Sequence, residues 1–161
     1  MSRLWAPWRM EYVSSESDRS NIFEDKIKSD DDREALILYR GELSVIIMNL
    51  YPYNNGHLLV LPIRKVESLI DLSVDEMSEI MTLTQKSMDI ISKVMSADGF
   101  NFGLNVGKAA GAGISEHIHF HIVPRWNGDS NFMPVVGNTK VVVQGLEDTY
   151  DALFPEFNKI D

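Results

Sequence analysis

The segment 117–123 constrains this chain more than any other, because histidine and bulky apolar residues alternate strictly along it. Three of the chain's four histidines occupy every second position there. They are His117, His119 and His121. Successive side chains of a β-strand point to opposite faces, so the pattern predicts a strand over His117–Val123. We expect three imidazoles about 7 Å apart on one face and an apolar opposite face in the core.

The rest of the chain predicts one α+β domain over residues 1–161, with its core at about 20–125 and a five-stranded, mostly antiparallel sheet. A capping box of Ser73 and Glu76 starts a long amphipathic helix that ends before Gly99. A helical turn near 22–27 and a short terminal helix complete the predicted elements. The predicted strands are 36–39, 43–48, 57–61, 100–106 and 117–123, and the terminal helix runs from Leu146 and is cut off by Pro155.

Composition excludes several classes of function. A formal net charge of −9 disfavours general binding to nucleic acid or to an anionic membrane. The longest apolar run, Leu58–Ile63, is far shorter than a membrane span, and the amino terminus lacks the apolar segment of a signal peptide. With no cysteine, thiolate catalysis, disulfides and cysteine zinc sites are absent. We expect a cytoplasmic protein with no nucleic-acid or membrane partner.

The histidine row allows three interpretations. The histidines are ordinary half-exposed strand residues, or a transition-metal site, or a catalytic site in which a neutral imidazole attacks phosphorus. Metal binding is the weaker hypothesis because Glu116 and Asp129 are the only nearby carboxylates. Catalysis suits the preceding loop, since Gly111 and Gly113 let backbone N–H groups approach phosphate oxygens.

Several motifs together resemble the histidine triad (HIT) family. His117–Val123 is similar to the triad motif, and Asn54–Pro62 resembles the family's Gly-His strand, which accounts for the fourth histidine, His57. Ile22 and Phe23 resemble a segment that packs on the base. Asn49 matches a residue that holds the ribose, and Asn105 through Ser115 resembles the phosphate-binding stretch.

The resemblance implies a HIT-like fold and a set of catalytic roles. His119 is implied as the nucleophile that forms a nucleotidyl-histidine, and His121 as a phosphate contact. His117 and His57 are implied as the relay that sets the tautomer. Amides near Gly113 and Ser115, with the Ser115 hydroxyl, complete the implied phosphate site.

The implied substrate is a dinucleoside polyphosphate such as diadenosine tetraphosphate, cleaved at the α-phosphate by hydrolysis or phosphorolysis. A phosphoramidase acting on AMP conjugates and a slow nucleotide-binding sensor stay open as alternatives. Residues 4–10 and 124–134 resemble a bacterial, Fhit-like branch and are expected to set subfamily specificity.

The resemblance also bears on cofactors and assembly. It implies no required cofactor, with Mg²⁺ entering only with the substrate. Where many relatives have a Cys-x-x-Cys zinc element this chain has Asn21–Glu24, so no zinc is expected there. A two-fold homodimer with joined sheets is implied, and the helix Met77–Met95 is a candidate contact because it has additional apolar residues. A core helix is the alternative.

Overall fold

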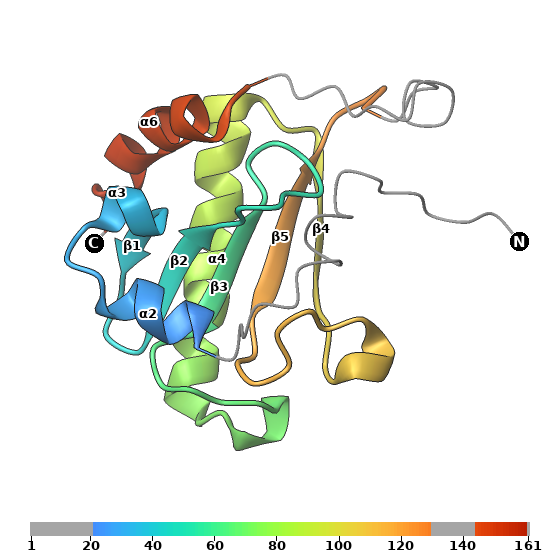
Figure 1. Ribbon diagram of the computed structural model, residues 1–161. Coiled ribbons are helices and arrows are strands. Elements are labelled where there is room, and N and C mark those ends of the chain that lie inside the picture. The colour runs from blue at the N-terminus through green and yellow to red at the C-terminus, as the bar shows by residue number, and fades with distance from the viewer. Residues whose placement is uncertain (1–20, 130–143, 161) are drawn as a thin grey trace, which may run out of the picture.

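A five-stranded antiparallel sheet forms the centre of the protein (Figure 1). The computed structural model describes residues 21–129 and 144–160. The strands lie in the order β1-β2-β3-β5-β4, and each described pair is antiparallel. Their bounds are β1 Ile37–Arg40, β2 Ser44–Met48, β3 Leu58–Pro62, β4 Gly99–Leu104 and β5 Phe120–Arg125. The α+β class and the five-stranded sheet predicted from the sequence are confirmed.

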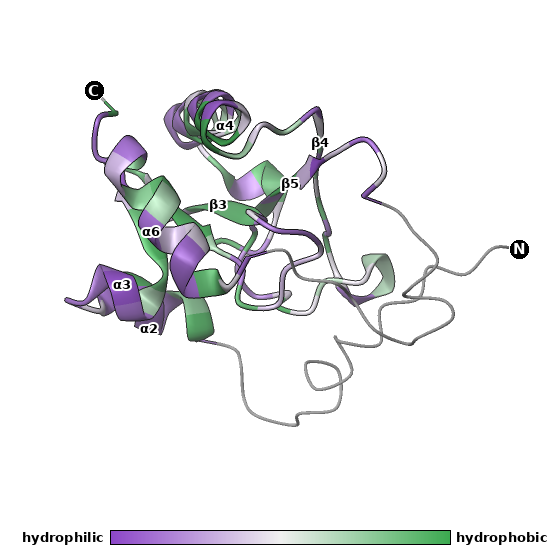
Figure 2. Cartoon of the chain, turned by 90° about the horizontal axis from the view of Figure 1, so that it is seen from above, coloured by the Kyte–Doolittle hydropathy of each residue, from purple (hydrophilic) through white to green (hydrophobic). Residues whose placement is uncertain are grey.

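Helices cover both faces of the sheet. Figure 2 shows α4 on one side and α2 and α3 on the other, with β3 between the two layers. The helices are α2 Ile22–Lys28, α3 Asp32–Ala35, α4 Val74–Met95 and α6 Leu146–Phe157, with short 3-10 helices η2 Leu69–Asp71 and η3 Lys108–Ala110. The predicted capping box is present, since the Glu76 backbone N–H donates to Ser73 Oγ and the Ser73 backbone N–H to Glu76 Oε2.

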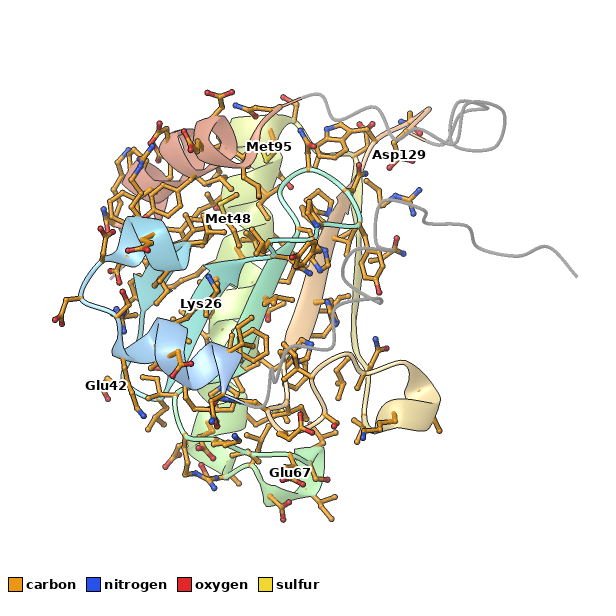
Figure 3. All side chains as sticks on the ribbon, viewed as in Figure 1. Lys26, Glu42, Met48, Glu67, Met95 and Asp129 are labelled. Carbon is orange, nitrogen blue, oxygen red and sulfur yellow. The ribbon has the colours of Figure 1, made fainter. Side chains whose placement is uncertain are left out.

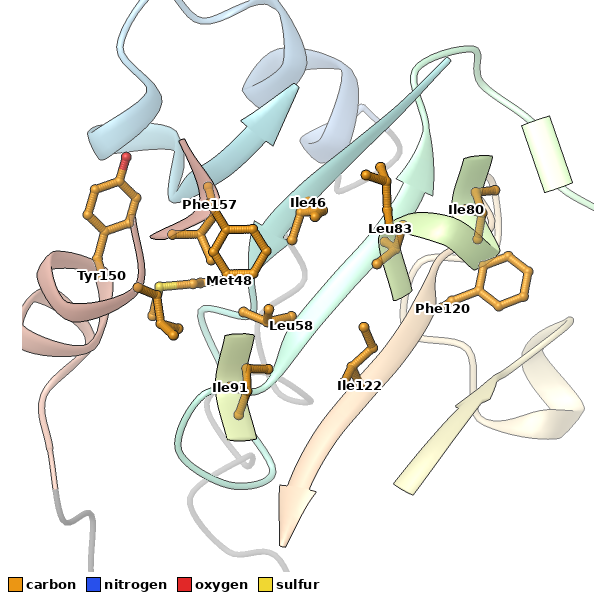
Figure 4. Close-up of a cluster of buried hydrophobic side chains, with 13 residues drawn as sticks. Ile46, Met48, Leu58, Ile80, Leu83, Ile91, Phe120, Ile122, Tyr150 and Phe157 are labelled. Atoms are coloured by element: carbon orange, nitrogen blue, oxygen red, sulfur yellow. The ribbon is translucent and has the colours of Figure 1, made fainter. Parts of the chain in front are cut away.

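The larger core lies between the sheet, α4 and α6 (Figure 4). Alternate strand residues point into it and meet one stripe of α4 and the inner face of α6. The members in Figure 4 include Ile46, Met48, Leu58, Phe120, Ile122, Ile80, Leu83, Ile91, Tyr150 and Phe157. Leu83 is buried here and Met81 and Val94 pack against the cluster. The additional apolar residues of the long helix are therefore used within the chain, as in the core-helix alternative.

A smaller core on the opposite face holds α2 and α3 against the sheet. Phe23 and Ala35 are buried there with the other set of alternating strand residues. Leu59 is one of these, and it pairs with His121 on the neighbouring strand. Because apolar residues 120 and 122 point to the larger core, the histidine between them points to the α2 face. The alternation predicted from the sequence therefore decides which layer contains the histidines.

The structure corrects several of the predicted element boundaries. The predicted strand 117–123 corresponds to β5, which begins at Phe120. His117 and His119 therefore lie in the segment just before β5. In that segment the Ile118 N–H donates to the Val66 carbonyl and not to a neighbouring strand. Pro62 and Pro124 lie inside β3 and β5. The helix α6 continues past Pro155, because Leu153 and Phe157 are fully buried on either side of it.

The acidic stretch before β1 forms α3, a helix that is absent from the elements predicted from the sequence. Asp31 caps this helix by accepting from the Glu34 N–H, a signal typical of helix starts. The tryptophan-containing segment 4–10 and residues 130–134 lie outside the described residues. Among the helices of residues 21–129 and 144–160, none combines the length and the apolar character that a membrane-spanning helix requires.

Candidate active site

The four histidines lie together on the α2 face of the sheet. The rings of His119 and His121 are 5.0 Å apart between centroids, and those of His121 and His57 are 5.1 Å apart. His117 joins the group through Phe23, whose ring lies 5.7 Å from His117 and 5.0 Å from His119. Three of the rings are almost fully buried, with exposures of 0% for His117, 1% for His57 and 7% for His119. The site is therefore an internal cluster open at one edge.

One hydrogen bond fixes the tautomer of His119. Its Nδ1 lies 2.8 Å from the backbone carbonyl oxygen of His117, which can only accept. The hydrogen of the neutral ring is therefore on Nδ1, and the lone pair is on Nε2. Burial lowers the pKa of His119, opposed by this hydrogen bond, and the charge of His117 lowers it further. His119 is thus held neutral with Nε2 as a nucleophilic atom.

A second chain of hydrogen bonds fixes His57 and His121. The backbone N–H of Tyr53 donates to His57 Nδ1 over 3.0 Å, so the hydrogen of neutral His57 is on Nε2. That atom lies 3.0 Å from His121 Nδ1, which must accept. Neutral His121 consequently has its hydrogen on Nε2. Its tautomer is opposite to that of His119, so adjacent rings present a lone pair and a donor.

The two predicted supporting histidines lie behind different neighbours. His57 is behind His121, whereas His117 is behind His119 and donates from Nε2 to the Pro62 carbonyl over 2.8 Å. Burial lowers the pKa of His117, although the Pro62 hydrogen bond and the charge of Glu24 act in the opposite direction. The expected relay thus consists of two separate supports.

A pocket opens over His119 and His121. Most of the nucleotide-binding residues that the sequence predicts line it. They are Ile22, Phe23, Asn49, Asn105 and Gly113. Lys26 also lines it and donates from Nζ to the Ala35 carbonyl over 2.7 Å, and Figure 3 shows it on the side of the sheet that faces the viewer.

Two predicted contacts are engaged within the protein. The Ser115 hydroxyl lies outside the pocket lining and donates to the Glu116 carboxylate over 2.8 Å. Asn49 accepts from the Tyr51 N–H at its Oδ1, which directs its Nδ2 to within 3.3 Å of His57 Nδ1. Asn49 therefore lines the pocket and also lies next to His57, the residue that supports His121.

Sequence reasoning missed the groups that anchor the His57 loop. The ring of Tyr53 stacks on His57 with centroids 5.1 Å apart. Asn54 donates to the Pro124 carbonyl and to Asp129, and Arg125 pairs with the same carboxylate. Figure 3 shows Asp129 beyond the end of β5. The Asn54-Asn55-Gly56 turn signal could have indicated a fixed loop, but not its partner 75 residues away.

Glu24 is the last residue of the stretch Asn21–Glu24, which stands where many relatives have the zinc element. Its carboxylate lies 2.6 Å from Lys65 Nζ and 3.9 Å from His117 Nδ1. Across the described parts of the chain, no three His, Cys, Asp or Glu side chains are grouped so that they could hold a metal ion. The arrangement is suited to nucleophilic chemistry by a neutral imidazole.

Comparison with known sequences relates the chain to one protein family. The HIT domain model matches residues 31–128. The chain is 42% identical over 166 residues to an AP-4-A phosphorylase of Mycobacterium tuberculosis, covering 98% of this chain and 85% of the relative. It is 40% identical over 93 residues to an asymmetrical bis(5'-nucleosyl)-tetraphosphatase of Schizosaccharomyces pombe, covering 58% of this chain and half of that protein.

The fold comparison points the same way. A zinc-bound histidine triad family protein of Mycobacterium smegmatis superposes with a TM-score of 0.69 at 25% identity, covering 86% of this chain and 93% of the other. The described fold thus has a counterpart among solved structures. The chain belongs to the histidine triad (HIT) family.

Proposed function

We propose that this protein cleaves dinucleoside polyphosphates of the diadenosine tetraphosphate type through a nucleotidyl-histidine at His119. The observation on which this rests is the hydrogen bond from His119 Nδ1 to the His117 carbonyl, which leaves Nε2 as the reactive atom. In the first step Nε2 bonds the α-phosphorus, and the bond from phosphorus to the bridging oxygen breaks. Diadenosine tetraphosphate then gives ATP and an AMP group on His119.

His121 has the complementary role. Its Nε2 hydrogen, fixed by His57 and the Tyr53 N–H, is a donor for the departing or non-bridging oxygen. The His119–His121 separation of 5.0 Å between centroids places this donor beside the nucleophile. Attack and charge stabilisation therefore need no metal in the site, and Mg²⁺ would enter with the polyphosphate.

The pocket supplies the nucleotide contacts in this proposal. Ile22 and Phe23 offer apolar surface for the base, and the polar side chain of Asn49 would contact the ribose. Asn105 and the backbone near Gly113 line the pocket where phosphates would lie. Ser115 contacts phosphate only after its hydroxyl leaves Glu116.

Phosphorolysis is the favoured second step. The supporting observation is that the relative matched along 98% of this chain is named a phosphorylase. Inorganic phosphate would attack the AMP phosphorus, break its bond to Nε2 and release ADP. Attack by water would release AMP, and the shorter match to a tetraphosphatase keeps hydrolysis as the second candidate.

Product analysis tests the function. Purified protein is incubated with diadenosine tetraphosphate and Mg²⁺, with and without inorganic phosphate, and the nucleotides are separated by ion-exchange chromatography. ADP plus ATP that depend on phosphate indicate phosphorolysis, whereas AMP plus ATP indicate hydrolysis. Tight binding without turnover would contradict the enzyme and favour the sensor. Release of AMP from adenosine 5′-phosphoramidate alone would favour the phosphoramidase.

We also propose a cytoplasmic homodimer joined along β4. This strand is at the edge of the sheet, and Phe102 on it and Val106 just beyond it are exposed apolar residues. An exposed apolar edge strand is a template for pairing with a second copy. Light scattering after size exclusion should give a dimer for the wild type and a monomer for Phe102→Asp. Ile70→Asp, at an exposed apolar residue of η2 outside the sheet, should remain dimeric.

A further inference from the structure

Glu24 is a buried carboxylate that the proposed chemistry does not use. It lies in the first turn of α2, with 15% of its side chain exposed, and faces away from the pocket toward Lys65 and His117. Oε1 is 2.6 Å from Lys65 Nζ, and Oε2 is 3.9 Å from His117 Nδ1. A buried carboxylate is costly unless it is compensated, so its retention beside the histidine cluster needs a reason.

The Lys65 ammonium keeps this carboxylate ionised. Burial raises the pKa of Glu24, but the hydrogen bond and the charge of Lys65 outweigh it and hold the pKa below its ordinary value. Lys65 also donates to Asn21 Oδ1 over 3.0 Å, which holds it over the start of α2. The lysine is the more exposed partner, at 37% of its side chain. Solvent therefore screens the cation more than the anion, and the negative charge predominates toward the protein interior.

His117 links Glu24 to the nucleophile. The ring of His117 donates from Nε2 to the Pro62 carbonyl, and the backbone carbonyl of His117 accepts from His119 Nδ1. The remaining ring nitrogen, Nδ1, faces the carboxylate. A negative charge thus lies behind the residue that holds the tautomer of His119.

We propose that Glu24 is a positioning residue whose charge, acting through His117, stabilises the cationic form of His119. The inference rests on the proposed function. When Nε2 bonds phosphorus, the His119 ring retains its Nδ1 hydrogen and becomes a cationic imidazolium. The Nδ1–H bond to the His117 carbonyl is then charge-assisted, and the nearby Glu24 anion, which solvent screens less than its Lys65 partner, lowers the energy of the charged state.

Packing alone does not explain Glu24. Phe23, on the same helical turn, is buried and contacts both His117 and His119, so it already anchors α2 to this segment. The substitution Glu24→Gln keeps the shape of the side chain and an oxygen for Lys65, and removes the negative charge. Asp25→Asn makes the same change of charge on the next, exposed residue of the helix and is the matched control.

The first experiment measures adenylylation of His119 in a single turnover. The full chain is mixed in excess with diadenosine tetraphosphate, and the AMP adduct is followed by intact mass. Glu24→Gln should form the adduct about tenfold more slowly than wild type, with unchanged affinity for AMP. Asp25→Asn should match wild type. Equal rates in the two variants would overturn the inference, as would a parallel loss of AMP affinity, which indicates a structural role.

The second experiment does not depend on turnover. Long-range ¹H–¹⁵N NMR of histidine-labelled protein reports the tautomer and the titration midpoint of each imidazole. Glu24→Gln should lower the midpoint of His117 relative to wild type and Asp25→Asn, and Lys65→Met should raise it. An unchanged midpoint in both variants would overturn the coupling. If wild type forms no adduct, the proposed function fails, and the NMR midpoints alone decide whether Glu24 acts on His117.

Discussion

The backbone carbonyl of His117 accepts the Nδ1 hydrogen of His119 over 2.8 Å, and this contact decides which nitrogen of His119 can react. The partner is a main-chain atom, so any side chain at 117 leaves it in place. The nucleophile is therefore oriented by the path of the chain before β5, and the side chain of His117 is available for its contacts with Pro62 and Glu24.

His119→Ala should abolish the covalent intermediate. Without Nε2 the α-phosphorus has no protein nucleophile, so turnover should fall by about 10³-fold or more. Intact mass after mixing with diadenosine tetraphosphate should show an AMP adduct on wild type and none on the variant. Binding of AMP should persist, because the apolar pocket residues are unchanged. An adduct that survives the substitution would contradict the assignment.

The support of His121 by His57 makes a second prediction. His57→Leu removes the donor to His121 Nδ1, so His121 can adopt either tautomer, and kcat/KM should fall about 10²-fold. His57→Gln is the matched variant, because its amide can donate to His121 and accept from the Tyr53 N–H. It should lose clearly less activity. Equal losses in the two variants would show that the tautomer of His121 does not matter.

The histidine layer could be predicted from the sequence because strand alternation is a local rule. The strict alternation over 117–123 predicts the imidazoles on the face opposite the larger core. The pairing of Leu59 with His121 then brings the Gly-His strand, and with it His57, beside them. The strand boundary was wrong because the Ile118 N–H bonds Val66, a contact set by tertiary structure.

The contacts that set tautomers could not be predicted in the same way. The Tyr53 N–H and the His117 carbonyl are main-chain groups. Every residue has the carbonyl and every residue except proline has the N–H, so no residue type marks them. Glu24 was equally hidden. A glutamate in the first turn of a helix is typical of an exposed residue, and its burial depends on Lys65, far along the chain.

Burial of neutral histidines predicts a loss of stability in mild acid. Burial lowers the pKa of His117 and His119 below the ordinary value of 6.5. Between the folded and unfolded pKa values the unfolded chain binds more protons, so the free energy of unfolding should fall as the pH drops below about 6.5. Urea unfolding between pH 7.5 and 5.5 measures this slope.

The variant His117→Gln tests the source of that slope. Glutamine does not titrate, and its Nε2 can still donate to the Pro62 carbonyl. The fall in unfolding free energy between pH 7.5 and 5.5 should therefore be smaller than in wild type. A variant slope equal to that of wild type would mean that His117 does not contribute to the acid sensitivity.

The start of α4 predicts a further loss of stability in stronger acid. Hydrogen bonds from Arg64 and from the Ser73 N–H lower the pKa of Glu76 from 4.5 to about 2. A carboxyl with a lowered folded pKa contributes stability above its unfolded pKa, and that contribution is lost as the pH falls from about 4.5 toward 2.

Glu76→Gln should cost about 1 kcal/mol at pH 7, a typical value for an N-terminal cap. The difference from wild type should shrink across that acid range in urea titrations, whereas Asp75→Asn, exposed on the same turn, should cost less at pH 7. A cost for Glu76→Gln that stays constant down to pH 2 would show that the ionised carboxylate is not what stabilises the helix start.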